Sequence, residues 1–294
     1  MVLLSPLPLT AGQKKDILTV YNHRREGRAT ETKTIRSMLN ARASETLSAT
    51  ALLSLRRREP ESCLVYASWA ALEPAEGRLD PEALAELRER LLRIGALGIE
   101  PVLCLYRGED PDWYAARGGW EKEDNLRCYL RYAGKLVRAV GHLASEYVTF
   151  FEPNELSWSR GGRDLRRSLV TLSHMACVHA RAYRLIRDTR TQRGLGDTRV
   201  GVVLRAVPAG RLRRELLLFK SPAAPGAYEK LPLLAMTRGE FRLPLRNTLR
   251  IRPGAYCDFV GLHCRREERD RCRTEMAAMT DVPLRDVPDQ DREG

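Results

Sequence analysis

The acidic residue best placed to take part in catalysis is Glu152. It directly follows a short apolar run and precedes Pro153 and Asn154. The run 147–151 is typical of a buried strand. In folds that alternate parallel strands with helices, catalytic groups lie at the carboxyl ends of the strands. The pattern therefore makes Glu152 a candidate catalytic residue.

Residues that could bind a metal or cofactor are less suitably placed. His174 and His179 lie five residues apart in a helical stretch, a spacing that does not put both rings squarely on one face, so packed or surface histidines are expected. The seven cysteines lie far apart and form no C-x-x-C pair, which predicts buried or free thiols in a reducing cytoplasm. We therefore expect no metal and no cofactor, and a cytoplasmic location.

The charge balance is strongly basic, with 50 Lys and Arg against 38 Asp and Glu and a net charge of +12. The basic residues are mostly arginines, and their short runs are scattered without interleaved aromatics. This favours solvated faces with weak, nonspecific attraction to polyanions. No apolar run approaches the roughly 18 residues of a membrane span. The apolar start, 1–9, contains two prolines and is not expected to be a signal peptide.

From about residue 62, short β-like runs alternate with helical stretches, which is typical of an α/β fold with a parallel sheet. Helices are expected where apolar residues recur at helical spacing, at 81–94, 126–143 and 165–187. A stretch rich in Pro and Gly, 222–253, is expected to hold little regular structure. Strands are expected at 62–69, 101–106, 147–151, 199–206 and 256–262.

Three regions follow from this pattern: a basic segment at 1–60 with a weakly amphipathic helix at about 35–55, a barrel portion at 61–264, and a charged, flexible tail at 265–294. Five or six strands fall short of the eight of a closed barrel, and an open sheet exposes its edges. Residues 10–60 must then supply a first strand, or a second copy or partner chain must complete the sheet.

Five short motifs carry a family resemblance. They are Ser68-Trp69 with Glu73-Pro74 and Gly77, Gly98-Ile99-Glu100-Pro101-Val102, Pro111-Asp112-Trp113 with Gly118-Gly119-Trp120, Thr149-Phe150-Phe151-Glu152-Pro153-Asn154, and Cys257-Asp258-Phe259-Val260-Gly261-Leu262. Their types and order resemble the family 1 glycoside hydrolases of the β-glucosidase and 6-phospho-β-glucosidase type, over about residues 62–264. The chain looks like a truncated, divergent relative. The resemblance implies an α/β fold with part of a (β/α)₈ TIM barrel.

The resemblance also assigns roles. It implies that Glu152 is the acid/base, that Arg107 and Asn154 lie at the substrate, and that Trp158 offers a stacking platform for a sugar. Retaining glycosidases need a second carboxyl group about 5–5.5 Å away as nucleophile. In the family that group lies in a "TENG"-like motif on the seventh strand, and this sequence holds no such motif. No strand is expected to hold the carboxylates that follow Asp258.

Several sugar-binding and orienting residues of the family are replaced, by Leu64, Arg107, Gly108, Phe151, His263 and Cys264. The resemblance therefore implies a nominal hydrolase of β-glycosides, in carbohydrate metabolism, whose activity is impaired or lost. The alternative is a non-catalytic pseudoenzyme that binds carbohydrate or a protein partner. A third reading, from charge alone, is a basic protein that associates with nucleic acid or ribosomes.

Overall fold

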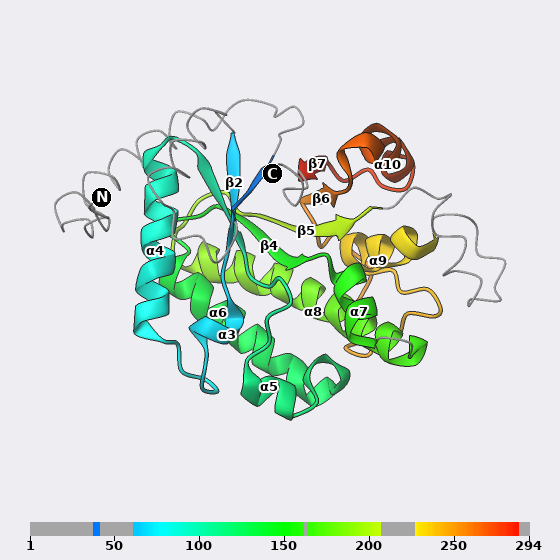
Figure 1. Ribbon diagram of the computed structural model, residues 1–294, viewed down its shortest axis with the longest axis horizontal. Helices are drawn as coiled ribbons and strands as arrows, with labels where there is room; N and C mark the ends of the chain where they lie inside the picture. The colour runs from blue at the N-terminus through cyan, green and yellow to red at the C-terminus, as the bar shows by residue number, and fades with distance from the viewer. Residues whose placement is uncertain (1–37, 42–60, 162–163, 207–226, 288–294) are drawn as a thin grey trace, which may run out of the picture.

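A computed structural model describes residues 38–41, 61–161, 164–206 and 227–287. Its strands form one parallel sheet in sequence order, with helices around the left, lower and right sides in Figure 1. Cα atoms of the first and last strands approach within 8 Å, so the sheet curves almost into a closed barrel. This confirms the predicted α/β class and partial barrel. The strands are β1 (Met38–Ala41), β2 (Ser62–Tyr66), β3 (Glu100–Cys104), β4 (Glu146–Phe151), β5 (Arg199–Arg205), β6 (Phe259–His263) and β7 (Leu284–Val287).

The helices begin where the sequence provides capping groups. The Asp80 side chain accepts a hydrogen bond from the Ala83 amide (2.8 Å) at the start of one helix, with Pro81 in its first turn, and Asp164 caps the longest. The α-helices are α3 (Trp69–Leu72), α4 (Pro81–Ala96), α5 (Asp112–Ala116), α6 (Leu126–Val140), α7 (Pro153–Gly161), α8 (Leu165–Gln192), α9 (Ala227–Arg238) and α10 (Arg269–Ala277). The 3₁₀ turns are η1 (Gly119–Glu121), η2 (Glu123–Asn125) and η5 (Arg266–Glu268).

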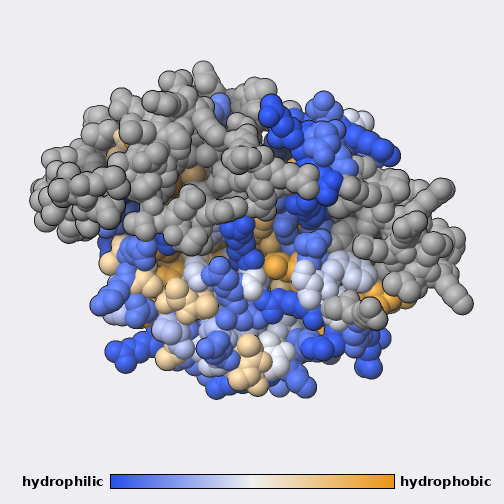
Figure 2. Space-filling view, in the orientation of Figure 1, coloured by the Kyte–Doolittle hydropathy of each residue, from blue (hydrophilic) through white to orange (hydrophobic). Residues whose placement is uncertain are grey.

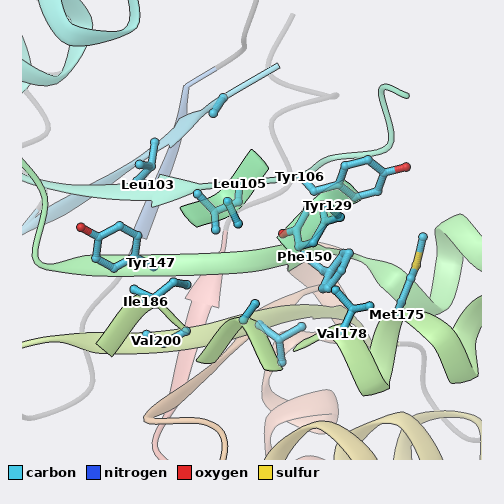
Figure 3. Packing of buried hydrophobic residues seen from close by; sticks show 14 of the residues in the cluster. Leu103, Leu105, Tyr106, Tyr129, Tyr147, Phe150, Met175, Val178, Ile186 and Val200 are labelled. Atoms are coloured by element: carbon cyan, nitrogen blue, oxygen red, sulfur yellow. The ribbon is translucent and has the colours of Figure 1, made fainter. Parts of the chain in front are cut away.

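The core has two layers because side chains alternate between the faces of each strand. One layer fills the barrel interior, with Leu64, Val102, Val203 and Phe259 among its members. The other lies between the sheet and its helices, where α6 and α8 pack on the strands (Figure 3). The helix-facing layer includes an aromatic cluster around Trp69, in which Trp120 is almost fully buried.

The amino-terminal region differs from the expected helix at 35–55. Residues 38–41 form β1 instead, paired in parallel with β2, and the remainder of that predicted helix lies outside the described residues. The backbone of β2 would otherwise have an unpaired edge, and satisfying its hydrogen bonds outweighs a weak helical pattern. Residues 10–60 therefore supply the first strand that the barrel requires.

The stretch 222–253, expected to be irregular, contains α9, which holds Pro232 in its interior. Proline removes one backbone donor from a helix, but Leu233, Ala235 and Met236 are fully buried in the core. Burial of these three side chains stabilises the helix despite the proline.

The segment 265–294, expected to be a flexible tail, contains η5, α10 and β7. β7 pairs in parallel with β6. Arg285 of β7 crosses the barrel interior to Glu146 of β4, with nitrogen–oxygen distances of 2.5 and 3.1 Å. This buried ion pair gives a charged segment a place in the sheet that hydrophobic periodicity could not reveal.

The surface is predominantly hydrophilic on the face in Figure 2, where hydrophobic residues lie in small groups between polar ones. Among the described residues, Leu243 is the large apolar side chain that stands mostly exposed, at 85%. None of the described helices is long and apolar enough to cross a bilayer. All seven cysteines are buried free thiols, and His174 and His179 are packed inside, as expected.

Candidate active site at the carboxyl ends of the strands

The carboxyl ends of the strands meet at one edge of the barrel because all strands run in the same direction. Tyr66 ends β2, Arg205 ends β5 and His263 ends β6, while Glu152 directly follows β4. Arg205 and His263 are register partners on neighbouring strands. Arg107 follows β3 by three residues and covers the Tyr66 ring, so the strand ends expected to share a face do so.

An irregularity in β4 aims the residues that follow it. Its register with β5 shifts between Val148 and Phe151. Thr149 and Phe150 both face the helices, whereas Val148 and Phe151 both belong to the interior cluster. Strict alternation would have placed residues 148 and 150 inside. A bulge of this kind re-aims side chains, and here it brings Phe151 inside and carries Glu152 to the rim.

Glu152 has a strained backbone. Its φ of +53° lies in the left-handed region, which costs a non-glycine residue about 1–2 kcal/mol. Two hydrogen bonds hold it: its amide donates to the Val203 carbonyl (2.7 Å), and its carbonyl accepts from the Leu156 amide (2.9 Å) at the start of α7. Strain that the surroundings maintain occurs most often at functional sites. The backbone thus marks Glu152 independently of its side chain.

The Glu152 carboxylate contacts two nitrogen-bearing side chains. Its Oε1 lies 2.5 Å from Nδ1 of His263 and 3.5 Å from Nη1 of Arg205. Nη1 of Arg205 also lies 3.2 Å from Nδ1 of His263. The guanidinium can only donate, and one proton lies between Oε1 and Nδ1 whichever atom carries it. The three side chains form a compact unit, the Glu152–His263–Arg205 cluster, that can hold or transfer one proton.

Aromatic rings pack beside this cluster. The Phe151 ring lies 5.2 Å from the His263 ring and 5.5 Å from the Tyr66 ring. The Arg107 guanidinium lies over both Tyr66 (4.4 Å) and Phe151 (5.4 Å). Cation–π contacts of this kind fix a guanidinium in place. Arg107 therefore presents a positive charge at the same rim as Glu152.

Asn154 lies beside the cluster but does not face solvent. Its amide donates to the Arg205 carbonyl (2.8 Å), and its side-chain oxygen accepts from the Arg205 amide (3.1 Å). The residue is fully buried. Both ends of the side chain are thus used to join α7 to β5, and a contact of Asn154 with substrate stays a prediction. Its role is to position Arg205.

Trp158 lies six residues beyond Glu152 on α7 and is half-buried. The described contacts of the Glu152 carboxylate and of the rings beneath it come from Tyr66, Arg107, Arg205 and His263. Trp158 is outside this set. Its role as a platform for a sugar stays a prediction.

Other carboxylates near the strand ends are engaged with protein groups. Asp110 binds Arg160 and accepts from the Tyr106 hydroxyl (2.5 Å), and Glu109 accepts from Ser68. The expectation that no strand follows β6 is wrong, because β7 is the seventh strand. Its Asp286, however, pairs with Arg273 of α10 (3.0 Å), while Val287 contributes to the interior cluster.

Sequence reasoning did not select Arg205 as a site residue. The signal was present, because a charged residue at the end of the apolar run 199–205 obeys the same strand-end rule that selected Glu152. Its contact with His263 needed the register of β5 and β6. Among the described residues, no group of three or more His, Cys, Asp or Glu is arranged to hold a metal ion.

The sequence model described as Glycosyl hydrolase family 1 matches residues 66–215, which is more than half of the chain. This chain belongs to glycosyl hydrolase family 1. Among curated relatives, β-glucosidase A of Acetivibrio thermocellus is 24% identical over 146 residues, covering 47% of this chain and 32% of that protein. Lactase/phlorizin hydrolase of Rattus norvegicus is 27% identical over 176 residues, covering 55% of this chain and 9% of that protein.

Solved structures show the same fold. A β-glucosidase from Exiguobacterium marinum superposes with a TM-score of 0.64 at 19% identity, covering 80% of this chain and 66% of that one. A β-glucosidase from Thermotoga maritima in complex with castanospermine gives a TM-score of 0.59 at 19% identity, covering 74% and 53%. The family match includes Glu152, Arg107 and Arg205, whereas β6 and β7 lie beyond it. The chain spans about a third of the length of the Acetivibrio relative.

Proposed function

We propose that this family 1 member binds a β-glycoside at the strand-end rim without carrying out retaining hydrolysis. The observation that carries the proposal is the partner set of the Glu152 carboxylate. Oε1 contacts His263 and Arg205, whereas a retaining enzyme sets its acid/base opposite a second carboxylate at about 5–5.5 Å.

The binding half of the proposal rests on the groups that line the rim. Arg107 lies over Tyr66 and Phe151, and the Glu152–His263–Arg205 cluster adds donors and acceptors. Sugar hydroxyls need such groups, and aromatic rings offer stacking surfaces. The castanospermine complex of the Thermotoga maritima relative supplies a suitable binding probe for this chain.

One observation favours true hydrolysis as the competing function. β7 is in register with β6, with Val287 opposite His263, so β7 ends at the same rim. Pro288-Asp289-Gln290-Asp291 follow in the sequence and lie outside the described residues. A carboxylate from this stretch would be the nucleophile in that case.

The test is turnover of nitrophenyl β-glycosides by the wild type, Glu152→Gln and Glu155→Gln. Glu155 is an exposed carboxylate on α7, the helix that follows Glu152, and gives the matched loss of charge. We expect all three at background, with no effect of azide, and castanospermine or cellobiose binding by calorimetry that weakens in Arg107→Leu. In an active enzyme, the general acid/base normally increases the reaction rate by about 10²–10⁴-fold.

Two results would overturn the proposal. Turnover that Glu152→Gln abolishes and azide restores would reveal a nucleophile and a covalent sugar intermediate, and Asp289→Asn would then be the next variant. A complete absence of binding by both sugars would remove the carbohydrate-binding half.

A further inference from the structure

A second concave site lies on the outer side of α8, away from the strand-end rim. It has a volume of about 320 Å³ and lies between α8 and the chain that leads from α9 to β6. Four of its seven lining residues are arginines: Arg181 and Arg184 from α8, and Arg250 and Arg252 from the facing chain. We call this the arginine cavity. Ile251 and Tyr256 form its less polar wall.

The arginine cavity lies toward the amino ends of the strands. Tyr256 packs against Tyr183, with ring centroids 6.1 Å apart, and the Tyr183 hydroxyl donates to Asp258 (3.0 Å). Asp258 in turn accepts from the backbone amide of Val200 at the start of β5 (2.8 Å). Glu152 lies beyond the opposite end of its strand, so the two sites are separate.

The seven lining residues of this cavity carry four positive charges and no negative one. In the part of the chain that the structure describes, none of its four arginines forms an ion pair with a carboxylate. Arginines nearby are paired: Arg187 with Asp258 (3.2 Å), Arg242 with Glu240 (3.3 Å) and Arg238 with Asp281 (2.7 Å). Four like charges around one concavity repel one another and produce a strong positive potential.

Hydrogen bonds nevertheless hold these side chains and their backbone in place. Arg181 donates to the Leu249 carbonyl (3.0 Å), and Arg184 donates to the Tyr256 hydroxyl (2.8 Å). That hydroxyl donates to the Arg252 carbonyl (2.8 Å). The Arg181 and Arg184 side chains are therefore oriented before any ligand arrives, which lowers the entropic cost of binding.

The chain that faces α8 is also held by hydrogen bonds. Asn247 accepts from the Ile251 amide and donates to the Ile251 carbonyl, both at 2.7 Å. Between these residues, Arg250 has a φ of +51°, a left-handed conformation that costs energy for any residue other than glycine. Maintained strain of this kind is common at ligand clamps. This backbone conformation places Arg250 in the lining of the cavity.

We propose that the arginine cavity binds a phosphate-bearing small molecule. Guanidinium groups bind phosphate oxygens in bidentate pairs, and a group with two or more negative charges offsets four cations better than a single carboxylate does. The volume matches a small ligand. Ile251 and Tyr256 contact the part of the ligand next to the phosphate. This site does not depend on Glu152 or on the proposed function.

The test is calorimetric titration of the full chain with phosphate, pyrophosphate and phenyl phosphate at constant ionic strength. The cavity variant is Arg181→Gln/Arg250→Gln, and the control is Arg238→Gln/Arg242→Gln, which removes two positive charges outside the cavity. We expect pyrophosphate to bind the wild type more tightly than phosphate. Phenyl phosphate should also bind more tightly than phosphate because of the less polar wall. The cavity variant should lose at least about 10-fold in affinity, and the control less than about 2-fold.

Pyrophosphate should also raise the Tm of the wild type but not that of the cavity variant, which checks folding and binding in one measurement. Three results would overturn the proposal: no binding of any of the three anions, equal weakening in both variants, or binding only of a long polyanion such as heparin. The second would indicate general attraction to a basic protein, and the third an extended surface instead of a cavity.

Discussion

Strand β4 has a glutamate at each end, and the two are used differently. Glu146 begins the strand, has a side chain only 4% exposed, and binds Arg285 and Arg199 at 2.5 and 3.1 Å. Glu152 follows the strand, has a side chain 15% exposed, and contacts Arg205 at 3.5 Å. Each glutamate faces nitrogen-bearing side chains from other strands. Glu146 is almost fully enclosed by the protein, whereas Glu152 is accessible to a ligand.

The difference lies in what surrounds the partners. The Arg285 side chain is 3% exposed and stacks on Phe259, with its guanidinium carbon 4.1 Å from the ring centroid. Glu146 and Arg285, enclosed in this way, join two strands of the sheet, and Arg199, with a side chain 30% exposed, adds a second positive charge beside them. At the other end, the Glu152 backbone is strained and its partners reach the rim. A glutamate that contacts nitrogen-bearing side chains therefore indicates function only where the end of its strand is accessible to ligands.

The largest expected effect separates the two glutamates by stability. Glu146→Gln leaves Arg285 buried without a matching charge, which should lower the free energy of unfolding by about 3–5 kcal/mol. Glu152→Gln should cost about 1 kcal/mol, because the Glu152 side chain is more exposed than that of Glu146 (15% against 4%) and an amide oxygen still accepts hydrogen bonds from the same partners. Urea unfolding of both variants measures the difference. Equal losses would show that the two ends of β4 are energetically alike.

The next effect concerns a histidine that touches the same strand between the two glutamates. Nδ1 of His179 lies 2.6 Å from the Thr149 hydroxyl, and burial lowers the pKa of His179 from 6.5 to about 4. Between these values the unfolded chain binds the proton and the folded chain does not. Stability should therefore be complete above pH 6.5 and fall by roughly 3 kcal/mol as the pH drops to 4.

The matched variant for this pH dependence is His179→Gln, which keeps a partner for Thr149 but does not titrate. Its unfolding free energy should be lower at neutral pH and flatter between pH 6.5 and 4. If the variant retains the full slope of the wild type, the acid sensitivity arises from other groups, with the two glutamates of β4 as the first to examine.

The smallest effect tests the strain that distinguishes Glu152 from Glu146. Glu152→Gly and Glu152→Ala remove the same carboxylate, but glycine alone tolerates a φ of +53° without cost. The glycine variant should be more stable than the alanine variant by about 1 kcal/mol. Thermal unfolding of the pair measures it. An alanine variant as stable as the glycine one would argue against a strained backbone at the site.

Local pattern was sufficient for most of the fold. The apolar runs ending near Tyr66, Phe151 and Arg205 became β2, β4 and β5, and the helical stripes became α4, α6 and α8. These elements bury a periodic apolar face, so their sequence carries the signal. The motif order identified the family for the same reason, because the matched residues are largely those that pack the barrel.

Segments stabilised by distant partners could not be recognised in this way. β1 forms because β2 offers a free edge, α9 because Leu233 and Met236 find the core, and β7 because Arg285 meets Glu146, which lies 139 residues earlier. Hydrogen bonding between strands and ion pairing inside a barrel leave no periodic mark on the sequence.

For the candidate site, the sequence by itself determined that Glu152, Arg107 and His263 each stand at or just beyond the end of a strand. Only the tertiary structure decided that Arg205 and His263 both contact the Glu152 carboxylate. It also decided that the buried Asn154 side chain binds the backbone of Arg205. It further decided that four arginines, with no carboxylate partner among the described residues, surround a cavity beside α8. The physical reason is that side-chain partners depend on register, on a bulge and on two left-handed residues, all of which arise when strands and loops pack together.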